Sequence, residues 1–467
     1  MVFSNPVFLF LFLPLTLLFY VLSPRSLKNL VLLGASLFFY AWGEELYVLI
    51  LIASIAMNYV AGLLIDGAGD RRSRLWFLWL GVAANLLLLG YYKYIGFLFE
   101  NLGMYDAAAA APPLPIGISF FTFQALSYLI DLYFRRVGVQ RNPLNLALYI
   151  SLFPQLIAGP IVRYAEVEAA IVDRRTTRSD LSEGMHQFVR GLAKKTLIAD
   201  PMGLLADRIF SIPEAGLTPE TAWVGAIAYS LQLYFDFSAY SDMAIGLGRV
   251  LGFKFPPNFN YPYVAQSITE FWRRWHMTLS RWFRDYLYIP LGGNRVSAAR
   301  IYLNLWIVFL ATGIWHGAAW TFIAWGAFHG AFLILERLGL ARLLEAAPRA
   351  VRHGYLLLVV ICGWVMFRAE TFGQSWAFYQ SMFLFERGAE AGFHPLARYL
   401  DAYLVVVMAI AAVFSIGLRP WVLARLEGQG EAPVLRFAGE AWFWVLFLVS
   451  IVSVGAASYS PFIYFRF

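Results

Sequence analysis

The run from Ile301 to Leu335 contains no aspartate, glutamate, lysine or arginine. An α-helix needs about 20 apolar residues to cross a bilayer, so this run is more than long enough for one span. Folded as a single helix it would be about 52 Å long, which exceeds the thickness of one bilayer. Two similar tetrapeptides inside it, WHGA from Trp315 and FHGA from Phe328, place glycine beside histidine. We therefore expect two membrane helices with a break between them.

Long apolar segments of this kind fill most of the chain. Of its 467 residues, 60% are hydrophobic and 14% are charged, whereas ordinary soluble domains have about 25% charged residues. The segments lack the alternation with period two that a membrane barrel would need. No hydrophilic domain or low-complexity linker interrupts them. We expect an all-α polytopic membrane protein with one domain over residues 1–467 and about 11–13 membrane-embedded helices, some of them re-entrant.

The basic residues predict how the first part of the chain crosses the membrane. Arginine and lysine occur in the loops Ser23–Asn29, Asp66–Arg74 and Phe134–Arg141, and the loops between these contain neither. Because cytoplasmic loops carry the excess of basic residues, we expect the N-terminus to face outward. The net charge of +7 fits this pattern, so nucleic acid is not an expected partner. After Asn142 the alternation fails, and two prolines in FPQLIAGP (Phe153–Pro160) indicate a broken or re-entrant helix.

Three further features restrict what the chain can do. Its single cysteine, Cys362, excludes a disulfide framework and a cysteine metal cluster. The histidines lack H-E-x-x-H or a comparable ligand spacing, so a metal site is not expected. The first segment, MVFSNPVFLFLFLPLTLLFYVL, has no basic region before its apolar core and no A-x-A-like site. We interpret it as a first membrane helix that stays on the protein, not as a signal peptide.

Two acidic residues lie within the apolar segment LYFDFSAYSDMAIGLGRV, Leu233–Val250. A carboxylate inside a membrane helix is costly unless it is paired or hydrated, so Asp236 and Asp242 are candidate functional residues. Helical spacing brings Asp236 towards Tyr240, and Arg249 lies two turns beyond Asp242 as its candidate partner. The sequence leaves open the alternative that both acids only join helices through hydrogen bonds.

The segment SITEFWRRWHMTLSRWFRDYLYIPLGGNR, Ser267–Arg295, predicts an aromatic-rich amphipathic helix. Its first four residues, S-x-x-E, have the spacing of a capping box, which marks a helix start. Continued from there, one helix places Trp272, His276, Leu279 and Phe283 on a shared apolar face. We therefore expect His276 to point inward, from a helix at the membrane surface or entering a cavity.

Arginines in the same segment are candidates for binding phosphate. Arg281, Arg284 and Arg295 lie off the apolar face, and Arg295 ends the sequence PLGGNR. Glycine lets backbone N–H groups approach a phosphate, and the guanidinium group is suited to bind it. The alternative is that these arginines only follow the distribution of basic residues in cytoplasmic loops.

Two histidines lie within the uncharged run, His316 and His329. A desolvated imidazole is neutral and can accept a proton from a hydroxyl group, which acyl transfer requires. Gly313 and Gly317 on either side of His316 let another backbone or a ligand come close. The alternative for each histidine is a buried core residue without a chemical role.

The chain ends in an aromatic segment, SYSPFIYFRF, Ser458–Phe467. Tyrosine and arginine at a membrane boundary are usually interfacial anchors. A sharper hypothesis is that the tail enters a cavity, where a hydroxyl group of Tyr464 or Ser460 receives an acyl group and passes it on.

Several of these segments resemble the membrane-bound O-acyltransferase family, and within it the bacterial branch of alginate O-acetyltransferases and peptidoglycan O-acetylating relatives. The resemblance rests on QLYFDFSAYSDMAIGLG, SITEFWRRWHMTLSRWFRDYLYIPLGGNR and GIWHGAAWTFIAWGAFHG, with support from PIGISFFTFQALSYLIDLY, LFPQLIAGPIVR and the PFIYFRF ending. It covers essentially the whole chain, and the central block is long and specific.

The resemblance implies a ring of helices around a funnel or tunnel, with a catalytic core at about residues 115–335 and C-terminal helices and a tail at 355–467. In that comparison His316 matches the family's catalytic histidine, and His276 matches a second histidine of the bacterial branch. We expect further residues to line the substrate path: Asp236, Tyr240, Asp242, Trp272, Trp315, His329 and Tyr464.

The implied reaction moves an acetyl group from cytoplasmic acetyl-CoA to a polysaccharide such as alginate outside, through a periplasmic acetyltransferase partner. The expected location is the cytoplasmic (inner) membrane of a bacterium, and no bound cofactor is expected. In this hypothesis His316 is the general base, and His276 assists as a proton donor or by orienting substrate. Arg281, Arg284 and Arg295 would bind the phosphates of CoA.

Other functions fit the same sequence features. Peptidoglycan O-acetylation and D-alanyl transfer onto teichoic acid are compatible with the same core. A transporter or flippase would also use intramembrane acids, histidines and broken helices, but its repeated halves are absent beyond the short WHGA/FHGA similarity. A structural scaffold would need neither His316 nor the acidic residues.

Overall fold

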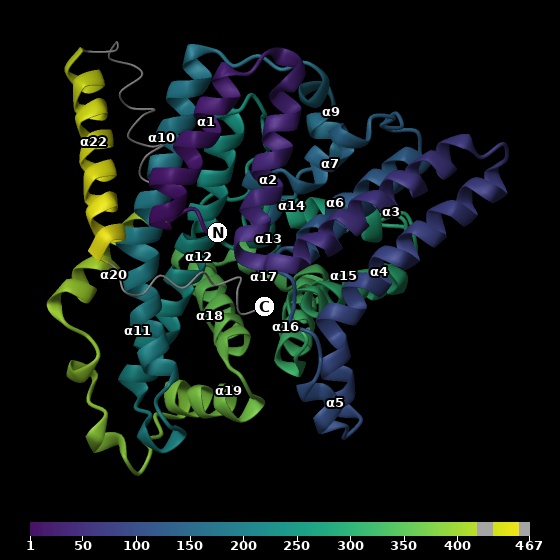
Figure 1. Ribbon diagram of the computed structural model, residues 1–467. Coiled ribbons are helices and arrows are strands. Elements are labelled where there is room, and N and C mark those ends of the chain that lie inside the picture. Colours follow the sequence, from purple (N-terminus) through teal and green to yellow (C-terminus); the bar gives the residue numbers. More distant parts are fainter. Residues whose placement is uncertain (418–432, 457–467) are drawn as a thin grey trace. The chain divides into compact units, whose positions relative to one another are not determined.

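The computed structural model describes residues 1–417 and 433–456, and these residues form helices without a strand (Figure 1). The expected all-α class is confirmed. By length and composition, six of the described helices can cross a membrane, or up to seven if one bent pair counts as a span. This is fewer than the expected 11–13 or so membrane-embedded helices. One further apolar helix of the described residues, Phe8–Leu22, is too short to count as a span. The six spans are Arg25–Gly67, Arg71–Asn101, Ala298–His316, Trp320–Ala346, Arg349–Arg368 and Gly439–Ala456.

The described chain divides into two compact units. Unit 1 comprises residues 1–188 and 240–257, and unit 2 comprises residues 189–239 and the described residues from 258 onward. Helix α12 (Pro219–Val250) contributes residues to both units. The single domain expected from the sequence stays a prediction.

Unit 1 is built from the N-terminal helices. They are α1 (Leu13–Leu22), α2 (Lys28–Glu44), α3 (Val48–Gly67), α4 (Arg71–Asn101), α5 (Tyr105–Ala109), α6 (Ile118–Tyr133), α7 (Pro143–Ser151), α8 (Phe153–Leu156), α9 (Tyr164–Val172) and most of α10 (Arg178–Lys194). The four-residue helix α8 lies in the segment FPQLIAGP, and no helix resumes before Tyr164. The predicted break at its prolines is confirmed.

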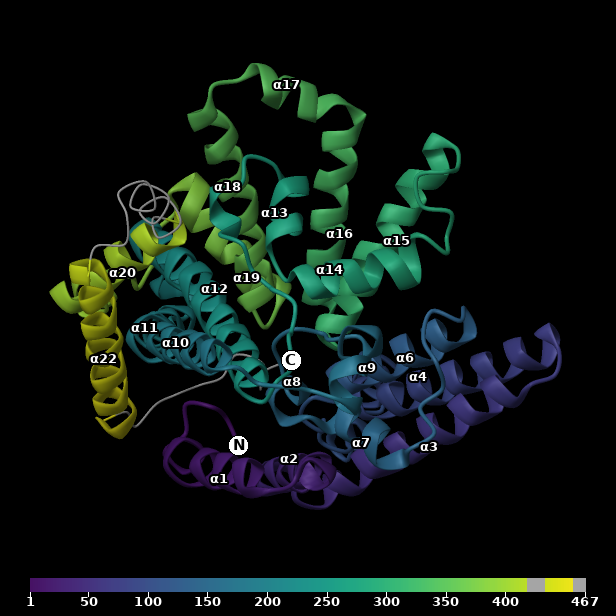
Figure 2. The ribbon, with the colours of Figure 1, turned by 90° about the horizontal axis from the view of Figure 1, so that it is seen from above.

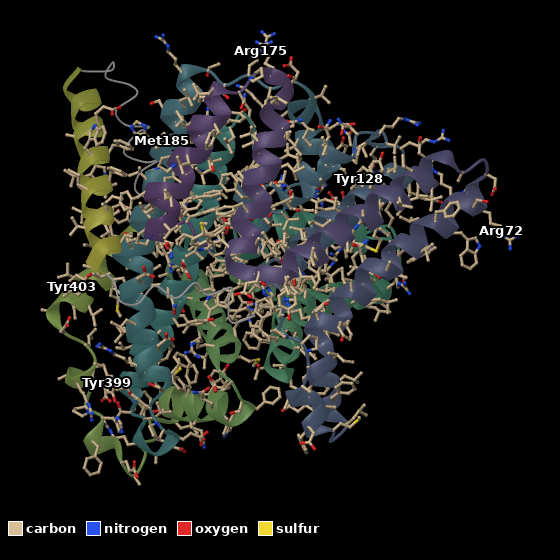
Figure 3. The ribbon with its side chains drawn as sticks, viewed as in Figure 1. Arg72, Tyr128, Arg175, Met185, Tyr399 and Tyr403 are labelled. Atoms are coloured by element: carbon tan, nitrogen blue, oxygen red, sulfur yellow. The ribbon has the colours of Figure 1, made fainter. Side chains whose placement is uncertain are left out.

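Small and polar side chains set the packing inside unit 1. Asn58 of α3 and Asn85 of α4 exchange amide hydrogen bonds of 3.1 and 2.8 Å. Such bonds hold helices together in lipid, where apolar burial gives little preference for protein contacts. Tyr128 of α6 lies in the interior and packs against Gly62, where an added Cβ would lie 2.9 Å from the phenol oxygen (Figure 3).

A capped turn joins α3 and α4. Asp70 accepts hydrogen bonds from the backbone N–H groups of Arg72 and Ser73 at 2.7 and 2.9 Å, so its side chain caps α4. Arg72 lies at the end of this helical hairpin and extends away from it (Figure 3). The basic segment Asp66–Arg74 therefore comprises a short turn, residues 68–70, and the adjoining ends of two candidate membrane spans.

Besides part of α12 and several short helical segments, unit 2 contains the following described helices. They are the π-helical segment η4 (Lys195–Ala199), α11 (Asp200–Phe210), α13 (Ile268–Arg274), α14 (Met277–Phe283), the π-helical segment η7 (Arg284–Tyr288), α15 (Ala298–His316), α16 (Trp320–Leu335), the π-helical segment η8 (Glu336–Leu340), α17 (Ala341–Ala346), α18 (Arg349–Arg368), α19 (Phe372–Tyr379), α20 (Ala402–Ser415) and α22 (Pro433–Ala456). Helix α13 lies between α16 and α18 (Figure 2).

Candidate active site

Helices α15 and α16 form a tightly packed hairpin in unit 2. An added Cβ on Gly313 would lie 2.4 Å from the carbonyl oxygen of Phe322, and one on Gly326 would lie 2.3 Å from that of Phe309. The two backbones therefore approach so closely that only glycine fits at both positions. Helix α15 ends at His316 and α16 begins at Trp320, which confirms the predicted break in the uncharged run and places it after His316.

Aromatic rings surround His316 at this break. Its ring meets Trp315, Trp325 and Phe367 edge to face, with centroid distances of 4.9, 5.0 and 5.1 Å. Trp325 comes from α16 and Phe367 from α18, so three helices contribute to the enclosure. The side chain is 8% exposed, which places the imidazole in a largely desolvated setting.

The structure corrects the predicted helix around His276. Instead of one amphipathic helix, two short helices occur, α13 ending at Arg274 and α14 beginning at Met277. His276 lies between them with φ +41° and ψ +53°, in the left-handed region. This conformation costs about 1–3 kcal/mol for a residue with a Cβ, and hydrophobic periodicity gives no signal for it. The predicted inward orientation is confirmed, because His276 is buried.

Asn258 determines which nitrogen of His276 carries the proton. The Oδ1 atom of Asn258 accepts hydrogen bonds from the backbone N–H and the hydroxyl group of Thr278, at 3.3 and 2.8 Å. A backbone N–H can only donate, so the atom that it meets is the amide oxygen. His276 Nδ1 lies 3.1 Å from the same oxygen and must therefore donate to it. Nε2 is then the acceptor nitrogen, and it has no hydrogen-bond partner among the described residues.

Burial makes His276 neutral at ordinary pH. Desolvation lowers the pKa of its imidazole to about 3. His276 lies outside the candidate membrane spans. A neutral ring with a fixed tautomer presents a lone pair at Nε2 and no second proton.

Trp315 joins the two predicted catalytic histidines into one aromatic cluster. Its ring centroid lies 4.9 Å from that of His316 and 6.2 Å from that of His276. Phe237 of α12 meets His276 edge to face at 4.5 Å. The structure therefore brings together residues that are 40 positions apart in the chain.

His329 lies in a second group of aromatic rings. Its ring is fully buried and meets Trp272 and Trp325 edge to face at 5.1 and 5.0 Å. Its Nε2 approaches Gly363 of α18, where an added Cβ would lie 2.7 Å away. Neither ring nitrogen has a hydrogen-bond partner in the part of the chain that the structure describes. Trp325 contacts both His316 and His329, so it links the two groups.

Asp236 pairs with a lysine that the sequence interpretation did not name. Lys195 Nζ of η4 lies 2.9 Å from Asp236 Oδ1 and 2.8 Å from Oδ1 of Asp200, at the start of α11. The predicted pairing of Arg249 with Asp242 is wrong, because Arg249 instead contacts two acids of α10. Those acids, Asp180 and Glu183, lie in unit 1 with it.

Tyr240 and Asp242 also belong to unit 1. Tyr240 stacks on Phe3 with ring centroids 4.4 Å apart, and Asp242 accepts a hydrogen bond of 3.1 Å from Gln187. Asp236 belongs to unit 2 instead, although all three lie on α12. Helical spacing thus correctly places the three on one helix, but their surroundings depend on tertiary packing.

The three candidate phosphate-binding arginines lie on the segment that precedes α15, Arg281 on α14, Arg284 at the start of η7 and Arg295 in the turn before α15. Arg284 is exposed and pairs with Asp285, Arg295 is exposed in the turn before α15, and Arg281 is partly buried on α14. Gly292 and Gly293 in that turn have φ +106° and +54°, which favours glycine. Helix α15 has 19 residues, so His316 lies about 28 Å along the helix axis from this end.

A buried carboxylate anchors α13, a feature that sequence reasoning missed. Glu336, which follows α16, accepts hydrogen bonds from the backbone N–H groups of Ile268 and Thr269 at 2.6 and 2.9 Å. The hydroxyl groups of Thr269 and Tyr355 donate to it as well, at 2.6 and 3.2 Å. The carboxylate thus satisfies the N-terminus of α13 and fixes that helix against α16 and α18. Ser267 caps the same helix, as predicted, by accepting from the Glu270 N–H at 3.0 Å.

Comparison with known proteins decides the family. A model of the membrane-bound O-acyltransferase family, MBOAT, matches residues 134–372, which include His276, His316 and His329. The chain belongs to this family. It is 42% identical to a probable alginate O-acetylase of Azotobacter vinelandii over 100% of both chains. It is 39% identical to a peptidoglycan O-acetyltransferase of Helicobacter pylori, over 82% of this chain and 77% of that protein. A teichoic acid D-alanyltransferase of Bacillus subtilis is 30% identical, over 47% of this chain and 58% of its own length.

Membership of the membrane-bound O-acyltransferase family makes the chain an O-acyltransferase and a multi-pass membrane protein. This excludes the transporter and the structural scaffold as its principal function. The described part of the chain holds no group of three or more histidine, cysteine or acidic residues that would bind a metal ion. Tyr464 and Ser460 lie outside the described residues.

Sequence reasoning missed Asn258, Glu336 and Lys195, and only one of them leaves a sequence signal. Lys195 follows a second lysine in the otherwise apolar GLAKKTLIA, and a lysine in such a segment needs a partner. Asn258 and Glu336 act through residues far away in sequence, so no local pattern marks them.

Proposed function

We propose that this O-acyltransferase moves an acetyl group from acetyl-CoA to hydroxyl groups of an extracytoplasmic polysaccharide such as alginate. The observation that carries the proposal is the enclosure of His316 at the break between α15 and α16, with His276 close by across Trp315. The full-length similarity to a probable alginate O-acetylase supports the choice of acetyl group and polysaccharide.

His316 acts as the general base in this proposal. Its imidazole takes the proton of the acceptor hydroxyl while the oxygen attacks the thioester carbonyl. The carbon–sulfur bond then breaks, and the imidazole returns the proton to the departing sulfur, so CoA leaves as the free thiol. The new ester bond forms on the acceptor, so charge and protons balance. His316 is buried among aromatic rings, and a neutral imidazole is the form that accepts a proton in general base catalysis.

The basic residues of unit 2 support entry of the donor from the cytoplasm. Arg295 and Arg300 lie at the start of α15, and Arg337 and Arg342 follow the end of α16. The start of α15 and the end of α16 are therefore both basic, which favours the cytoplasmic side of the membrane for these two helix ends. The turn between the helices, where His316 lies, would then point towards the other side of the membrane. A CoA molecule held by Arg281, Arg284 and Arg295 would have to extend along α15 towards His316.

Other parts of the expected mechanism belong to the same proposal. Trp272, Trp315, Asp236 and His329, all of unit 2, are proposed to line the substrate path, while the same role for Tyr240 and Asp242 stays a prediction from the sequence. A periplasmic acetyltransferase partner would complete transfer to the polysaccharide, and the tail hydroxyl of Tyr464 or Ser460 would carry the acyl group to it. The protein would act in a bacterial inner membrane with its N-terminus outward.

Release of CoA thiol from acetyl-CoA tests the proposal. The purified full chain in detergent should release thiol when an alginate oligosaccharide is present as the hydroxyl acceptor. His316→Ala should reduce the rate on the order of 10²–10⁴-fold, the usual contribution of a positioned general base. The matched control is His186→Ala, because His186 lies on α10 and contacts Ser182 of the same helix. Equal rates for His316→Ala and wild type would reject His316 as the base.

The acceptor and acyl group require their own comparison. Peptidoglycan fragments in place of alginate oligosaccharide test the activity named for the Helicobacter pylori relative. A D-alanyl thioester in place of acetyl-CoA tests the activity named for the Bacillus subtilis relative. Turnover with either of these alone would retain the acyltransferase and replace the proposed substrate.

A further inference from the structure

The unpartnered nitrogen of His276 points to a ligand. Nε2 is buried and has no hydrogen-bond partner among the described residues, while the ring as a whole is 1% exposed. A buried acceptor without a donor is costly, so it is normally satisfied by protein, water or ligand. The left-handed backbone at His276 adds to this cost, which is consistent with a side chain held in place for a purpose.

The character of that nitrogen follows from Asn258. The amide oxygen of Asn258 already receives two donors from Thr278, one of them a backbone N–H. A third contact on this oxygen, from His276 Nδ1, can only be another donor. His276 therefore holds its proton on Nδ1 and offers a lone pair at Nε2. A group with that lone pair binds an O–H or N–H donor and cannot serve as a proton donor.

We propose that Asn258 is a positioning residue that fixes this tautomer, so that His276 Nε2 accepts a hydrogen bond from a hydroxyl group of the acyl acceptor. The inference rests on the proposed function for the identity of the ligand. It decides between the two roles expected for His276 from the sequence, in favour of orienting substrate. His316 then removes the proton from the attacking hydroxyl, while His276 holds the acceptor through a hydroxyl group.

Nitrogen NMR of histidine tests the tautomer directly. The full chain, labelled with ¹⁵N-histidine and kept in detergent, contains six histidines, and loss of one signal set in His276→Gln assigns His276. We expect a neutral ring with its proton on Nδ1 at neutral pH. Asn258→Asp keeps an acceptor oxygen and should keep this tautomer, whereas Asn258→Leu removes the acceptor and should give a mixture. Thr278→Val is the matched control, because it removes a different donor to the same oxygen and should leave the tautomer unchanged.

Kinetics test the role in binding. Thiol release with acetyl-CoA and the alginate oligosaccharide should show a raised acceptor KM in Asn258→Leu, with the KM for acetyl-CoA close to wild type. Asn258→Asp should recover most of the acceptor KM. A neighbouring carboxylate raises the pKa of an imidazole, so the activity of Asn258→Asp should be lost at a higher pH on acidification than that of wild type.

A proton on Nε2 of His276 in the wild-type protein would overturn the proposal, as would an unchanged tautomer in Asn258→Leu. A change only in thermal stability, with acceptor KM and pH profile as in wild type, would reduce Asn258 to a structural residue. The NMR measurement does not require turnover. A wild-type protein that releases no thiol would therefore count against the proposed function, and the tautomer result would still decide the role of Asn258.

Discussion

The Nζ atom of Lys195 lies 2.9 Å from Oδ1 of Asp236, and both side chains are almost completely buried. A second carboxylate, that of Asp200, contacts the same ammonium group at 2.8 Å. One cation thus pairs with two acids, and the three side chains come from three elements, η4, α11 and α12. The acid that the sequence singles out is part of a local charge cluster.

Removal of Lys195 should destabilise unit 2 strongly. Lys195→Met keeps the length of the side chain but leaves two neighbouring carboxylates without their shared cation. Breaking a buried ion pair from one side typically costs about 3–5 kcal/mol. We expect a large fall in the thermal unfolding midpoint of the detergent-solubilised protein.

The double variant Lys195→Met, Asp236→Asn is the matched control. It removes one positive and one negative group together and should recover part of the lost stability. If Lys195→Met and wild type unfold at the same temperature, the cluster contributes nothing to stability.

Replacement of Glu336 should loosen the segment that carries His276. Glu336→Ala removes the acceptor for two backbone N–H groups and two hydroxyl groups at the start of α13. An unsatisfied buried donor costs about 1–3 kcal/mol. We expect a lower unfolding temperature and a lower kcat in the thiol-release assay.

Tyr355→Phe provides the comparison for Glu336, because it removes only one of the four donors. It should cost about 1 kcal/mol, the net value of one hydrogen bond, and leave kcat near that of wild type. An activity of Glu336→Ala equal to that of Tyr355→Phe would show that α13 does not need this anchor.

The sequence predicts the helical class and a break within Ile301–Leu335 because both depend on local composition and length, but the structure is needed to place that break after His316. The sequence also predicts the burial of His276, because the residues of the predicted apolar face are buried although the segment forms two short helices instead of one. It does not predict the turn at His276, whose left-handed backbone depends on contacts with distant residues such as Asn258.

The partners of charged residues also depend on contacts that are distant in sequence, which local spacing does not predict. Spacing along α12 suggests Arg249 as a partner for Asp242, but Arg249 meets acids on another helix. Ion pairs within one helix contribute only about 0.2–0.5 kcal/mol, so tertiary contacts readily override them. Glu336 accepts a hydrogen bond from the backbone N–H group of Ile268, which lies 68 positions earlier in the chain. Local hydrophobic periodicity cannot predict such a contact.

Gly326 should not tolerate a side chain. In Gly326→Ala the new Cβ would lie 2.3 Å from the carbonyl oxygen of Phe309 and 3.2 Å from the Cα of Gly313. Both neighbours are backbone atoms, so the helices must separate, and His316 at the end of α15 would lose its contact with Trp325. Overpacking of this kind costs about 1–3 kcal/mol. We expect reduced stability and reduced thiol release.

Gly354→Ala is the control for Gly326, since Gly354 lies on α18 with nothing within 4 Å of an added Cβ. Alanine in an open helical position should stabilise the protein by about 0.5–1 kcal/mol. If both variants behave alike, close packing of α15 and α16 does not control the site.

Acid should destabilise the protein partly through His276. Burial lowers the pKa of its imidazole to about 3 in the folded protein, whereas an unfolded histidine titrates near a pKa of about 6.5. Between these values the unfolded state binds the extra proton, so the free energy of unfolding falls as pH falls from about 6.5 towards 3. One such group contributes at most about 1.4 kcal/mol per pH unit.

The difference between wild type and His276→Gln isolates this contribution. Glutamine does not titrate, so its unfolding midpoint should fall less steeply than that of wild type between pH 6.5 and pH 4.5 or so. Above about pH 7.5 the two curves should run parallel, because the imidazole is then neutral in both states. Parallel curves over the whole range would mean that His276 binds a proton as readily when folded as when unfolded. In that case its ring would not be held in a desolvated, neutral form.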